Sequence, residues 1–514
     1  MGGMSLIGRP SIRASLGLLL ALAYFAVPVR QTPRIYDEGS IVDGADRILR
    51  GQVPYRDFNT GYPPAQFYTI ASIFSIFGET LTVERIWDAL WRMAIAGMAV
   101  VLARTAASPQ RAHPLLLICA ALITGACGFP LYPMITGMLP CLAAVWFALR
   151  YLKDGRACWL FFSGLACGAA ALYRHDLAAC VCGGVAVTAV YQAISEGKSS
   201  WLRPVAVFLA GFVLAVAIPV AYFWSWAPHE VLKESFIDFP RINLAARRLP
   251  LPGPISLRAW RDFYLPLAII AASISALRRS STPRKAVILL LLLTSVATLV
   301  LATQRLEAPH AYPSIVFSLV LLCACLATWR AENRRLARLL LSGTVLCYGL
   351  SPLYVWTWQM TGLREAVRHR SAPEPSGQTA RAGLVPVATD QRQAVLYIQE
   401  HVPPDSPLFV GTTSHRLQLY NDALFYFLAG RPRATRFDMF VPGVTDTFAA
   451  QSEIARDLHE KHPPYVVLFR PPVSHEPNLS SADSGVTILD DAIRQEYVQE
   501  AEFGRYTIWR RTER

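Results

Sequence analysis

The chain has 514 residues, of which 53% are hydrophobic and only 17% are charged. A soluble globular protein carries about 25% charged residues, so an ordinary soluble enzyme is excluded, and the clumping of the apolar residues excludes a disordered or fibrous chain. The formal net charge is +13, but the arginines recur between apolar runs and form no single patch, which argues against a nucleic-acid partner. The sequence therefore predicts a polytopic α-helical membrane protein with a soluble part.

Eleven apolar runs are candidates for membrane-spanning helices, each of which needs about 20 mainly apolar residues. They cover 12–29, 84–104, 114–129, 133–150, 157–173, 177–195, 204–226, 259–277, 285–303, 309–328 and 337–358. No small-residue cleavage pattern follows the first run, which we expect to remain as an anchor. The ten cysteines lie in or beside these runs and are expected to pack there, without disulfides or metal.

The basic residues predict how these helices are oriented. With the N-terminus in the cytoplasm, every short loop on that side is basic, for example the loops with Arg104 and Arg111 or with Arg150 and Lys153. The short loops opposite carry few positive charges, as the positive-inside rule requires. An odd number of spans puts the C-terminus outside. The large excess of Arg over Lys suggests a GC-rich bacterial genome. We therefore expect a bacterial inner-membrane protein, and the outside C-terminus would lie in the periplasm.

Three outside segments are long, namely 30–83, 227–258 and the tail after the last span. The cytoplasmic loops are too short to build a site, so we expect the function in these segments. A stretch rich in Ser, Pro, Gly and Ala predicts a linker over 359–389. The predicted organisation is a transmembrane domain (1–358), this linker and an extracytoplasmic domain (390–514).

The extracytoplasmic domain is predicted to alternate helices and strands. Its predicted helices cover 390–401, 416–429, 447–462 and 488–496, and its predicted strands cover 408–411, 466–469 and 503–510. This alternation favours a small α/β domain. The domain has no phosphate-binding glycine loop and no nucleophile motif, so we expect it to cover the site or to recognise the acceptor.

The first outside segment begins with two adjacent carboxylates, Asp37 and Glu38. Over 41–50, apolar residues share one helical face and charged residues take the other, which predicts a helix lying in the membrane interface. Residues 65–77 are apolar but too short to cross, and predict a second interfacial or re-entrant helix. The acidic pair has two interpretations, a solvated pair that caps the first helix or a general base at the lipid–water boundary.

The order of features in this segment resembles the GT-C class of integral membrane glycosyltransferases. It is similar to the protein O-mannosyltransferases and to the lipid A aminoarabinose transferases. The matching pieces are Asp37-Glu38, Tyr62-Pro63-Pro64, the Phe74–Gly78 turn and Glu84-Arg85. The resemblance implies a GT-C-like transmembrane domain that moves a sugar, with inversion, from a polyprenyl-phosphate donor in the bilayer to an extracytoplasmic lipid, glycan or protein.

The resemblance also implies catalytic residues. Asp37 matches the first-loop acid that acts as the base, and Glu38 shares that role or orients the base. Asp57 stands where related enzymes carry a second acid, although it could instead be a charge partner of Arg56. Tyr62 replaces the histidine that relatives have before the proline pair, which puts a metal role there in doubt. No metal ligand is assigned, and a divalent cation is left open as a cofactor.

Four further residues are candidates for binding the donor phosphate. Arg174 and His175 interrupt an apolar stretch at an outside turn, and the resemblance implies a phosphate-binding arginine there. Arg305 and His310 lie in a second outside turn that resembles the opening of a late span in the family. The alternative at the first turn is a simple polar turn, and at the second an ion pair between Arg305 and Glu307.

The segment 227–258 ends in a proline-rich stretch that predicts a folded loop over the site. Its Arg247 and Arg248 could meet the carrier or an acidic lipid, or form a plain surface. Two other functions remain as alternatives. A polymerase or ligase of lipid-linked oligosaccharides would place its catalytic residues in a later loop and would not need Asp37. A transporter would have charged residues in mid-membrane and inverted repeats, and the sequence has few of the former and no obvious repeat.

Overall fold

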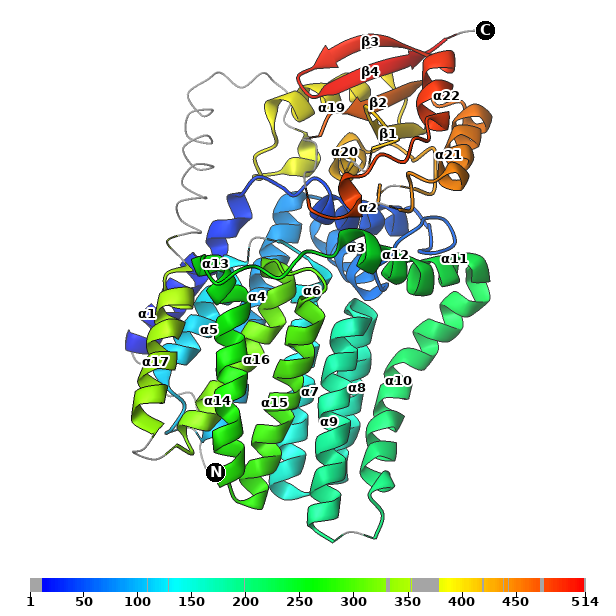
Figure 1. Cartoon of the computed structure of the whole chain (residues 1–514). Coiled ribbons are helices and arrows are strands. Elements are labelled where there is room, and N and C mark those ends of the chain that lie inside the picture. The colour runs from blue at the N-terminus through cyan, green and yellow to red at the C-terminus, as the bar shows by residue number, and fades with distance from the viewer. Residues whose placement is uncertain are drawn as a thin grey trace, which may run out of the picture.

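The structure is a computed structural model that describes residues 12–108, 110–127, 129–197, 199–329, 333–351, 353, 379–417, 420–437, 439–441, 443–471 and 476–512. Its helices form a bundle, and a sheet with its own helices sits on one end of that bundle (Figure 1). We call residues 379–512 the C-terminal part and the end of the bundle beneath it the covered end.

The bundle follows the predicted apolar runs. Its helices are α1 (Ile12–Ala26), α4 (Leu81–Ala107), α5 (Pro114–Ala126), α6 (Pro133–Thr136), α7 (Met138–Asp154), α8 (Ala157–Tyr173), α9 (His175–Ser195), α10 (Leu202–Trp226), α14 (Leu265–Arg279), α15 (Thr282–Ala302), α16 (Ala308–Leu326) and α17 (Arg334–Thr344). Six helical stretches among the described residues are long and apolar enough to cross a membrane. The chain is therefore a polytopic helical membrane protein, and eleven spans remain a prediction.

Short elements lie across the covered end of the bundle (Figure 1). They are η1 (Val27–Arg30), α2 (Asp37–Leu49), α3 (Ala65–Phe77), α11 (His229–Lys233), η2 (Glu234–Asp238), α12 (Phe239–Arg247), α13 (Leu257–Ala259) and η3 (Trp260–Tyr264), while η5 (Val345–Gly349) follows α17. The 13-residue helix α3 packs against α2 and buries Phe67, Ile70 and Phe74. The prediction of a short helix between the first two spans is therefore confirmed.

The C-terminal part contains a four-stranded mixed sheet in the order β1-β2-β4-β3, in which β1 and β2 are parallel and the other pairs antiparallel. Its elements are η6 (Ala380–Ala382), α19 (Thr389–His401), β1 (Leu408–Thr412), α20 (Ala423–Ala429), α21 (Phe448–Lys461), β2 (Tyr465–Phe469), η7 (Leu479–Ser481), α22 (Ile488–Glu496), β3 (Tyr497–Phe503) and β4 (Tyr506–Arg511). Helices and strands thus alternate as expected. Most of the predicted linker lies outside the described residues, and the predicted domain boundaries stay predictions.

Two predicted elements of the C-terminal part are wrong in extent. The predicted strand at 503–510 corresponds to β4, which begins at Tyr506 and pairs with an unpredicted strand, β3. Gly504 takes a φ of 57° in the tight turn that joins the two strands. The helix predicted over 416–429 begins only at Ala423. Its start is set by Asp422, whose side chain accepts a hydrogen bond from the backbone N–H of Phe425 and caps the helix.

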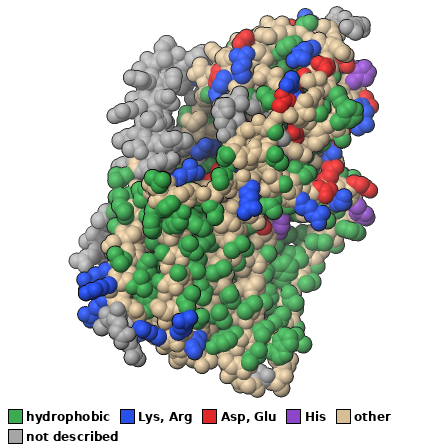
Figure 2. All heavy atoms as spheres, viewed as in Figure 1, with side chains coloured by type: hydrophobic (Ala, Val, Ile, Leu, Met, Phe, Trp, Pro, Cys, Tyr) green, Lys and Arg blue, Asp and Glu red, His purple; other side chains and the backbone are tan. Residues whose placement is uncertain are grey.

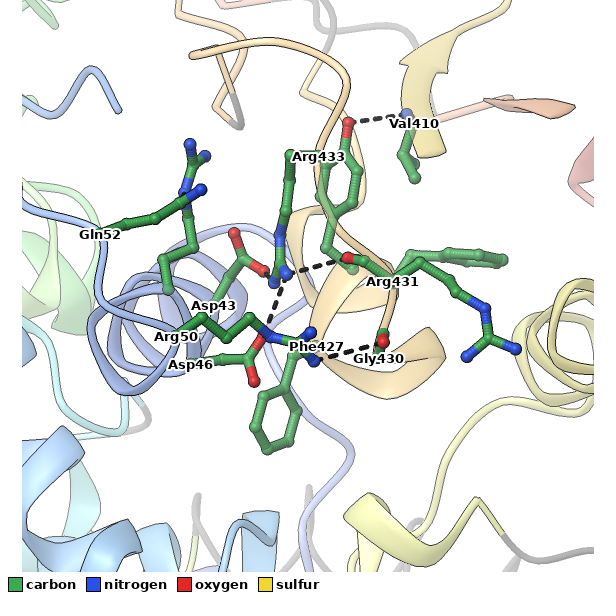
Figure 3. A network of polar contacts seen from close by, with 12 residues as sticks. Asp43, Asp46, Arg50, Gln52, Val410, Phe427, Gly430, Arg431 and Arg433 are labelled. Carbon is green, nitrogen blue, oxygen red and sulfur yellow. Dashed lines mark hydrogen bonds and ion pairs between the residues drawn. The ribbon is translucent and has the colours of Figure 1, made fainter. Parts of the chain in front are cut away.

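The charged face of α2, a helix predicted to lie in the membrane interface, is covered by the C-terminal part. Asp43 and Asp46 are buried under the C-terminal part, where Arg433 forms ion pairs with both carboxylates. Arg381 adds a 2.9 Å pair to Asp46. Figure 3 shows Arg433 pointing into α2 between the two aspartates. These ion pairs, together with a backbone hydrogen bond of 2.9 Å from Leu424 to residue 35, join the C-terminal part to the first loop.

Candidate active site

A cavity of about 130 Å³ opens at the covered end of the bundle. The starts of α2, α9 and α16, the end of α12 and the loop before α21 in the C-terminal part supply its walls. Its charged and imidazole side chains are those of Asp37, Arg174, His175, Asp176, Arg247, Arg305, Glu307 and His310. The structure thus brings Asp37 and all four predicted phosphate-binding residues to one cavity, although the sequence separates them by up to 273 positions.

Asp37 is the first residue of α2, and its side chain lines the cavity. No residue that the structure describes hydrogen-bonds to its carboxylate. Burial raises the pKa of Asp37 to about 6, against the nearby positive charge of Arg247 and with help from the negative charge of Glu307. A carboxylate with this pKa is ionised at neutral pH and is a stronger base than an exposed aspartate.

Glu38 has a different environment, because successive side chains on a helix point about 100° apart. It is fully buried and accepts two hydrogen bonds from Arg85 of α4, at 2.5 and 2.8 Å. It also accepts the backbone N–H of Arg34 at 2.8 Å, and Arg85 donates to the carbonyl of Pro28 at 2.8 Å. Glu38 therefore ties the start of α2 to the bundle and fixes the direction of Asp37.

Helix α4 carries more buried charge than the sequence interpretation allowed. Besides Arg85, it buries Asp88 and Arg92, which pair at 2.6 Å. Arg92 donates to the carbonyls of Thr124, Cys127 and Phe129, and Asp88 accepts the backbone N–H of Leu131. Both side chains thus hold the backbone from the end of α5 to the start of α6 by hydrogen bonds, and this segment lines the cavity through Phe129 and Tyr132.

Asp57 lies outside the cavity lining. Its carboxylate pairs with Arg56 at 2.6 Å and accepts the backbone N–H of Val53 at 2.7 Å. The side chain is 28% exposed. This geometry favours the alternative interpretation of Asp57 as a charge partner that fixes a turn.

Arg174 and His175 line the cavity from the junction of α8 and α9. Arg174 forms a two-pronged contact with Asp176, at 2.8 and 3.0 Å. The ring of His175 packs edge-on against Phe236. Asp176 partly neutralises Arg174, so this guanidinium adds less positive charge to the cavity than a lone arginine would.

Arg305, Glu307 and His310 form a connected group at the start of α16. Arg305 donates to Glu307 at 2.6 Å, so the ion pair considered as an alternative is present. His310 lies 3.4 Å from the same carboxylate and bonds Tyr132 at 3.0 Å. Burial alone would raise the pKa of Glu307, but the contacts with His310 and Arg305 lower it to about 2. Glu307 is therefore ionised, and it cannot act as a base at neutral pH.

The C-terminal part reaches the cavity as well. Met439 and Val441 line it, and Glu476 accepts two hydrogen bonds from Arg305, of 2.8 and 2.6 Å. Neither the composition nor a motif of the tail indicated these contacts. They depend on how the tail folds over the bundle, which local sequence does not encode.

Arg247 lines the cavity, whereas the sequence left it open as a contact to the carrier or an acidic lipid, or as a plain surface residue. It ends α12, and its guanidinium lies 5.0 Å from the ring centre of Tyr420. It makes no ion pair with any carboxylate in the described part of the chain. The available signal was the Arg247-Arg248 pair at the end of a loop expected to cover the site. Of the three cavity arginines, Arg247 is thus the least neutralised.

The cavity combines a carboxylate able to accept a proton with a guanidinium able to bind an anion. Such a pair can activate a hydroxyl and hold a phosphate leaving group. No group of three or more His, Cys, Asp or Glu side chains among the described residues has the geometry to hold a metal ion.

Comparison with known proteins agrees with this architecture. The family model for dolichyl-phosphate-mannose-protein mannosyltransferase matches residues 62–224. The crystal structure of ArnT from Cupriavidus metallidurans bound to undecaprenyl phosphate superposes with a TM-score of 0.58 at 16% identity, over 96% of this chain and 97% of that one. The chain has the fold of the GT-C class of membrane glycosyltransferases. The structure of ArnT from the same organism in the apo state gives a TM-score of 0.59 at 15% identity, with the same coverage.

The GT-C resemblance predicted from the first loop is therefore confirmed, and it extends over nearly the whole chain. No curated protein matches the sequence. The GT-C family model begins at Tyr62, so it excludes the segment that carries Asp37. The assignment of a role to Asp37 rests on the cavity.

Proposed function

We propose that the protein is a GT-C glycosyltransferase that moves a sugar from a polyprenyl-phosphate donor to a hydroxyl group of an acceptor. The observation that carries this proposal is the carboxylate of Asp37, to which no described residue hydrogen-bonds, in the same cavity as Arg247, Arg174 and Arg305. The matched family is named for a dolichyl-phosphate sugar donor, and the ArnT structure holds undecaprenyl phosphate. Both names point to the same donor chemistry.

Asp37 would act as the general base. The acceptor hydroxyl gives its proton to the Asp37 carboxylate as its oxygen attacks the anomeric carbon of the donor sugar. The bond between that carbon and the phosphate oxygen breaks, and its electron pair leaves with the polyprenyl phosphate. A single displacement of this kind inverts the anomeric centre. A positioned base contributes about 10²- to 10⁴-fold to the rate.

Arginine side chains would stabilise the leaving group. The carrier phosphate has one negative charge in the donor and gains a second as it leaves, so a fixed positive charge favours the transition state over the ground state. Arg247 is the best candidate, because it makes no ion pair with a described carboxylate and lies near Asp37. Arg174 and Arg305 line the same cavity and would also stabilise the phosphate, together with the rings of His175 and His310.

Glu38 would be a positioning residue and not a second base. Its carboxylate accepts hydrogen bonds from Arg85 and from the backbone N–H of Arg34, and it does not line the cavity. Asp57 takes no part in this proposal, because it lies outside the cavity lining. The sugar is either a hexose or a pentose, and the acceptor is a lipid, a glycan or a protein.

The covered end of the bundle would face the periplasm. The turns that join α4 to α5, α7 to α8 and α14 to α15 lie at the opposite end, and these turns and the helix ends beside them carry basic residues, which would face the cytoplasm by the positive-inside rule. Figure 2 shows Lys and Arg atoms in blue at the lower left of the bundle. The sugar transfer would then take place at the outer surface of a bacterial inner membrane.

Transfer of radiolabelled sugar from a panel of polyprenyl-phosphate sugars, in membranes that contain the wild type or Asp37→Asn, tests this proposal. We expect transfer by the wild type and a loss of at least about 100-fold in the variant at equal expression, because the base is removed without a change in shape. Asp57→Asn is the matched control, since it removes a carboxylate of the same loop that lies outside the cavity. Equal transfer by wild type and Asp37→Asn would refute the assigned base.

A further inference from the structure

The contact between Glu476 and Arg305 has the form of an anion-binding site that is already filled. Two guanidinium nitrogens of Arg305 donate to the two carboxylate oxygens of Glu476, at 2.8 and 2.6 Å. A phosphate accepts the same parallel pair of hydrogen bonds from an arginine. Glu476 therefore occupies the face of Arg305 that a carrier phosphate would use.

The charges around the cavity favour an exchange of one anion for another. The three guanidinium groups in the lining are balanced by the carboxylates of Asp37, Asp176 and Glu307, and Glu476 adds a fourth carboxylate. An incoming phosphodiester would add a further negative charge to a site that already has an excess. Release of Glu476 from Arg305 removes that excess, so donor binding and the Glu476 contact oppose each other.

The Glu476 carboxylate has other partners that would hold it after release. The side-chain amide of Asn478 donates to it at 3.0 Å, and the hydroxyl of Ser480 lies 3.5 Å away. All three residues lie on one short stretch before α22, outside the strands of the sheet. The carboxylate is 29% exposed, so it can turn toward water without the cost of a fully buried group.

We propose that Glu476 is an internal stand-in for the donor phosphate, which the C-terminal part places on Arg305 and which the polyprenyl-phosphate donor displaces. This inference rests on the proposed function, and it adds that Glu476 competes with the donor phosphate for Arg305. The exchange also reaches α12, because Arg305 donates to the backbone carbonyl of Arg247 at 3.1 Å. Donor binding would thereby remove the ion pair that links the stretch from Glu476 to Thr487 to Arg305, while η7 in that stretch keeps its packing against α12.

The direct test is the affinity of the purified protein in detergent for undecaprenyl phosphate. Glu476→Gln keeps the size of the side chain and removes its charge, and we expect it to bind the carrier about tenfold more tightly than the wild type. Arg305→Gln should bind it more weakly. Asp483→Asn is the matched control, because Asp483 lies on the same stretch but pairs with Arg416 at the surface, and its affinity should equal that of the wild type.

The inference is overturned if Glu476→Gln binds the carrier as tightly as the wild type or more weakly, as a purely structural ion pair would require. It is overturned together with the donor class of the proposed function if no form of the protein binds the carrier. A second measurement needs no variant. Amide hydrogen exchange at 476–487 in the wild type should become faster when undecaprenyl phosphate is added. An unchanged or slower rate also contradicts the displacement of Glu476 by the carrier phosphate.

Discussion

Burial destabilises the negative charge of Asp37 more than the nearby arginines stabilise it, which distinguishes this residue from most surface aspartates. Its pKa of about 6 gives the reaction a definite pH dependence. Only the deprotonated carboxylate accepts a proton, so kcat/KM should be constant above pH 7 and fall about tenfold per pH unit well below pH 6. The fall should begin at a higher pH than for an exposed aspartate, because the pKa is raised. Initial rates between pH 4.5 and 8 measure this limb, and a flat profile from pH 5 to 7 would contradict the assignment.

Arg247 and its neighbour Arg248 form a matched pair for testing the anion site. Arg247 lines the cavity, whereas Arg248 is exposed and does not line it. Loss of a hydrogen bond to a charged group costs about 1.5–3 kcal/mol, so Arg247→Gln should lower kcat/KM for the donor by about 10- to 100-fold. Arg248→Gln should retain the wild-type value. Equal effects of the two substitutions would mean that the cavity does not use Arg247 as a specific contact.

The sequence singled out several of the residues that line the cavity, where their pattern was local, and their roles stay predictions. The acidic pair indicated Asp37, and the polar turns indicated Arg174 and Arg305. The sequence could not distinguish the roles of Asp37 and Glu38, because that difference depends on Arg85 of α4 reaching only one of them. It likewise could not find Glu476, whose partner lies 171 positions earlier in the chain.

Helix α2 illustrates the same limit for an element. Its periodicity correctly predicted a helix with one apolar and one charged face. The pattern predicted a helix in the membrane interface, and the charged face of that helix meets Arg433, which follows Asp43 by 390 positions. A pattern of charges identifies a polar face but does not distinguish a solvated face from one that is paired with a distant segment.

The ion pairs on α2 predict how the C-terminal part is held. Arg433→Met leaves the buried carboxylates of Asp43 and Asp46 with a lost partner, and loss of one member of a buried pair costs about 3–5 kcal/mol. We expect a clearly lower midpoint of thermal unfolding in detergent, followed by tryptophan fluorescence. Arg416→Met is the control, since its ion pair with Asp483 is exposed and worth about 0–1 kcal/mol.

A further variant separates pairing from packing at the same position. Adding Asp43→Asn and Asp46→Asn to Arg433→Met removes the unpaired charges, so the triple variant should regain part of the lost stability. If the triple variant is less stable than Arg433→Met alone, the aspartates have other stabilising partners. One such partner is Arg381, which pairs with Asp46 at 2.9 Å.

For the whole molecule, the positions of the cavity and of the basic loops give a single prediction of orientation. The cavity and the C-terminal part lie at one end of the bundle, and the arginine-rich connections of the helices lie at the other (Figure 1). The apolar runs predicted these helices well, because hydrophobic length is a property of the local sequence. The sequence predicted that the C-terminal part covers the site or recognises the acceptor. The residues that make the contact, such as Glu476 and Arg305, were not predictable, because their pairing depends on segments far apart in the chain.

Cysteine labelling in a cysteine-free background measures this orientation. Leu479→Cys introduces a thiol at an exposed site of the C-terminal part, and Lys153→Cys introduces one at an exposed site in the last turn of α7. In intact cells with a permeable outer membrane, an impermeant maleimide should label position 479 and not position 153. Both should react after the inner membrane is opened. The reverse pattern would put the cavity in the cytoplasm, where the positive-inside rule and the direction of sugar transfer would both be contradicted.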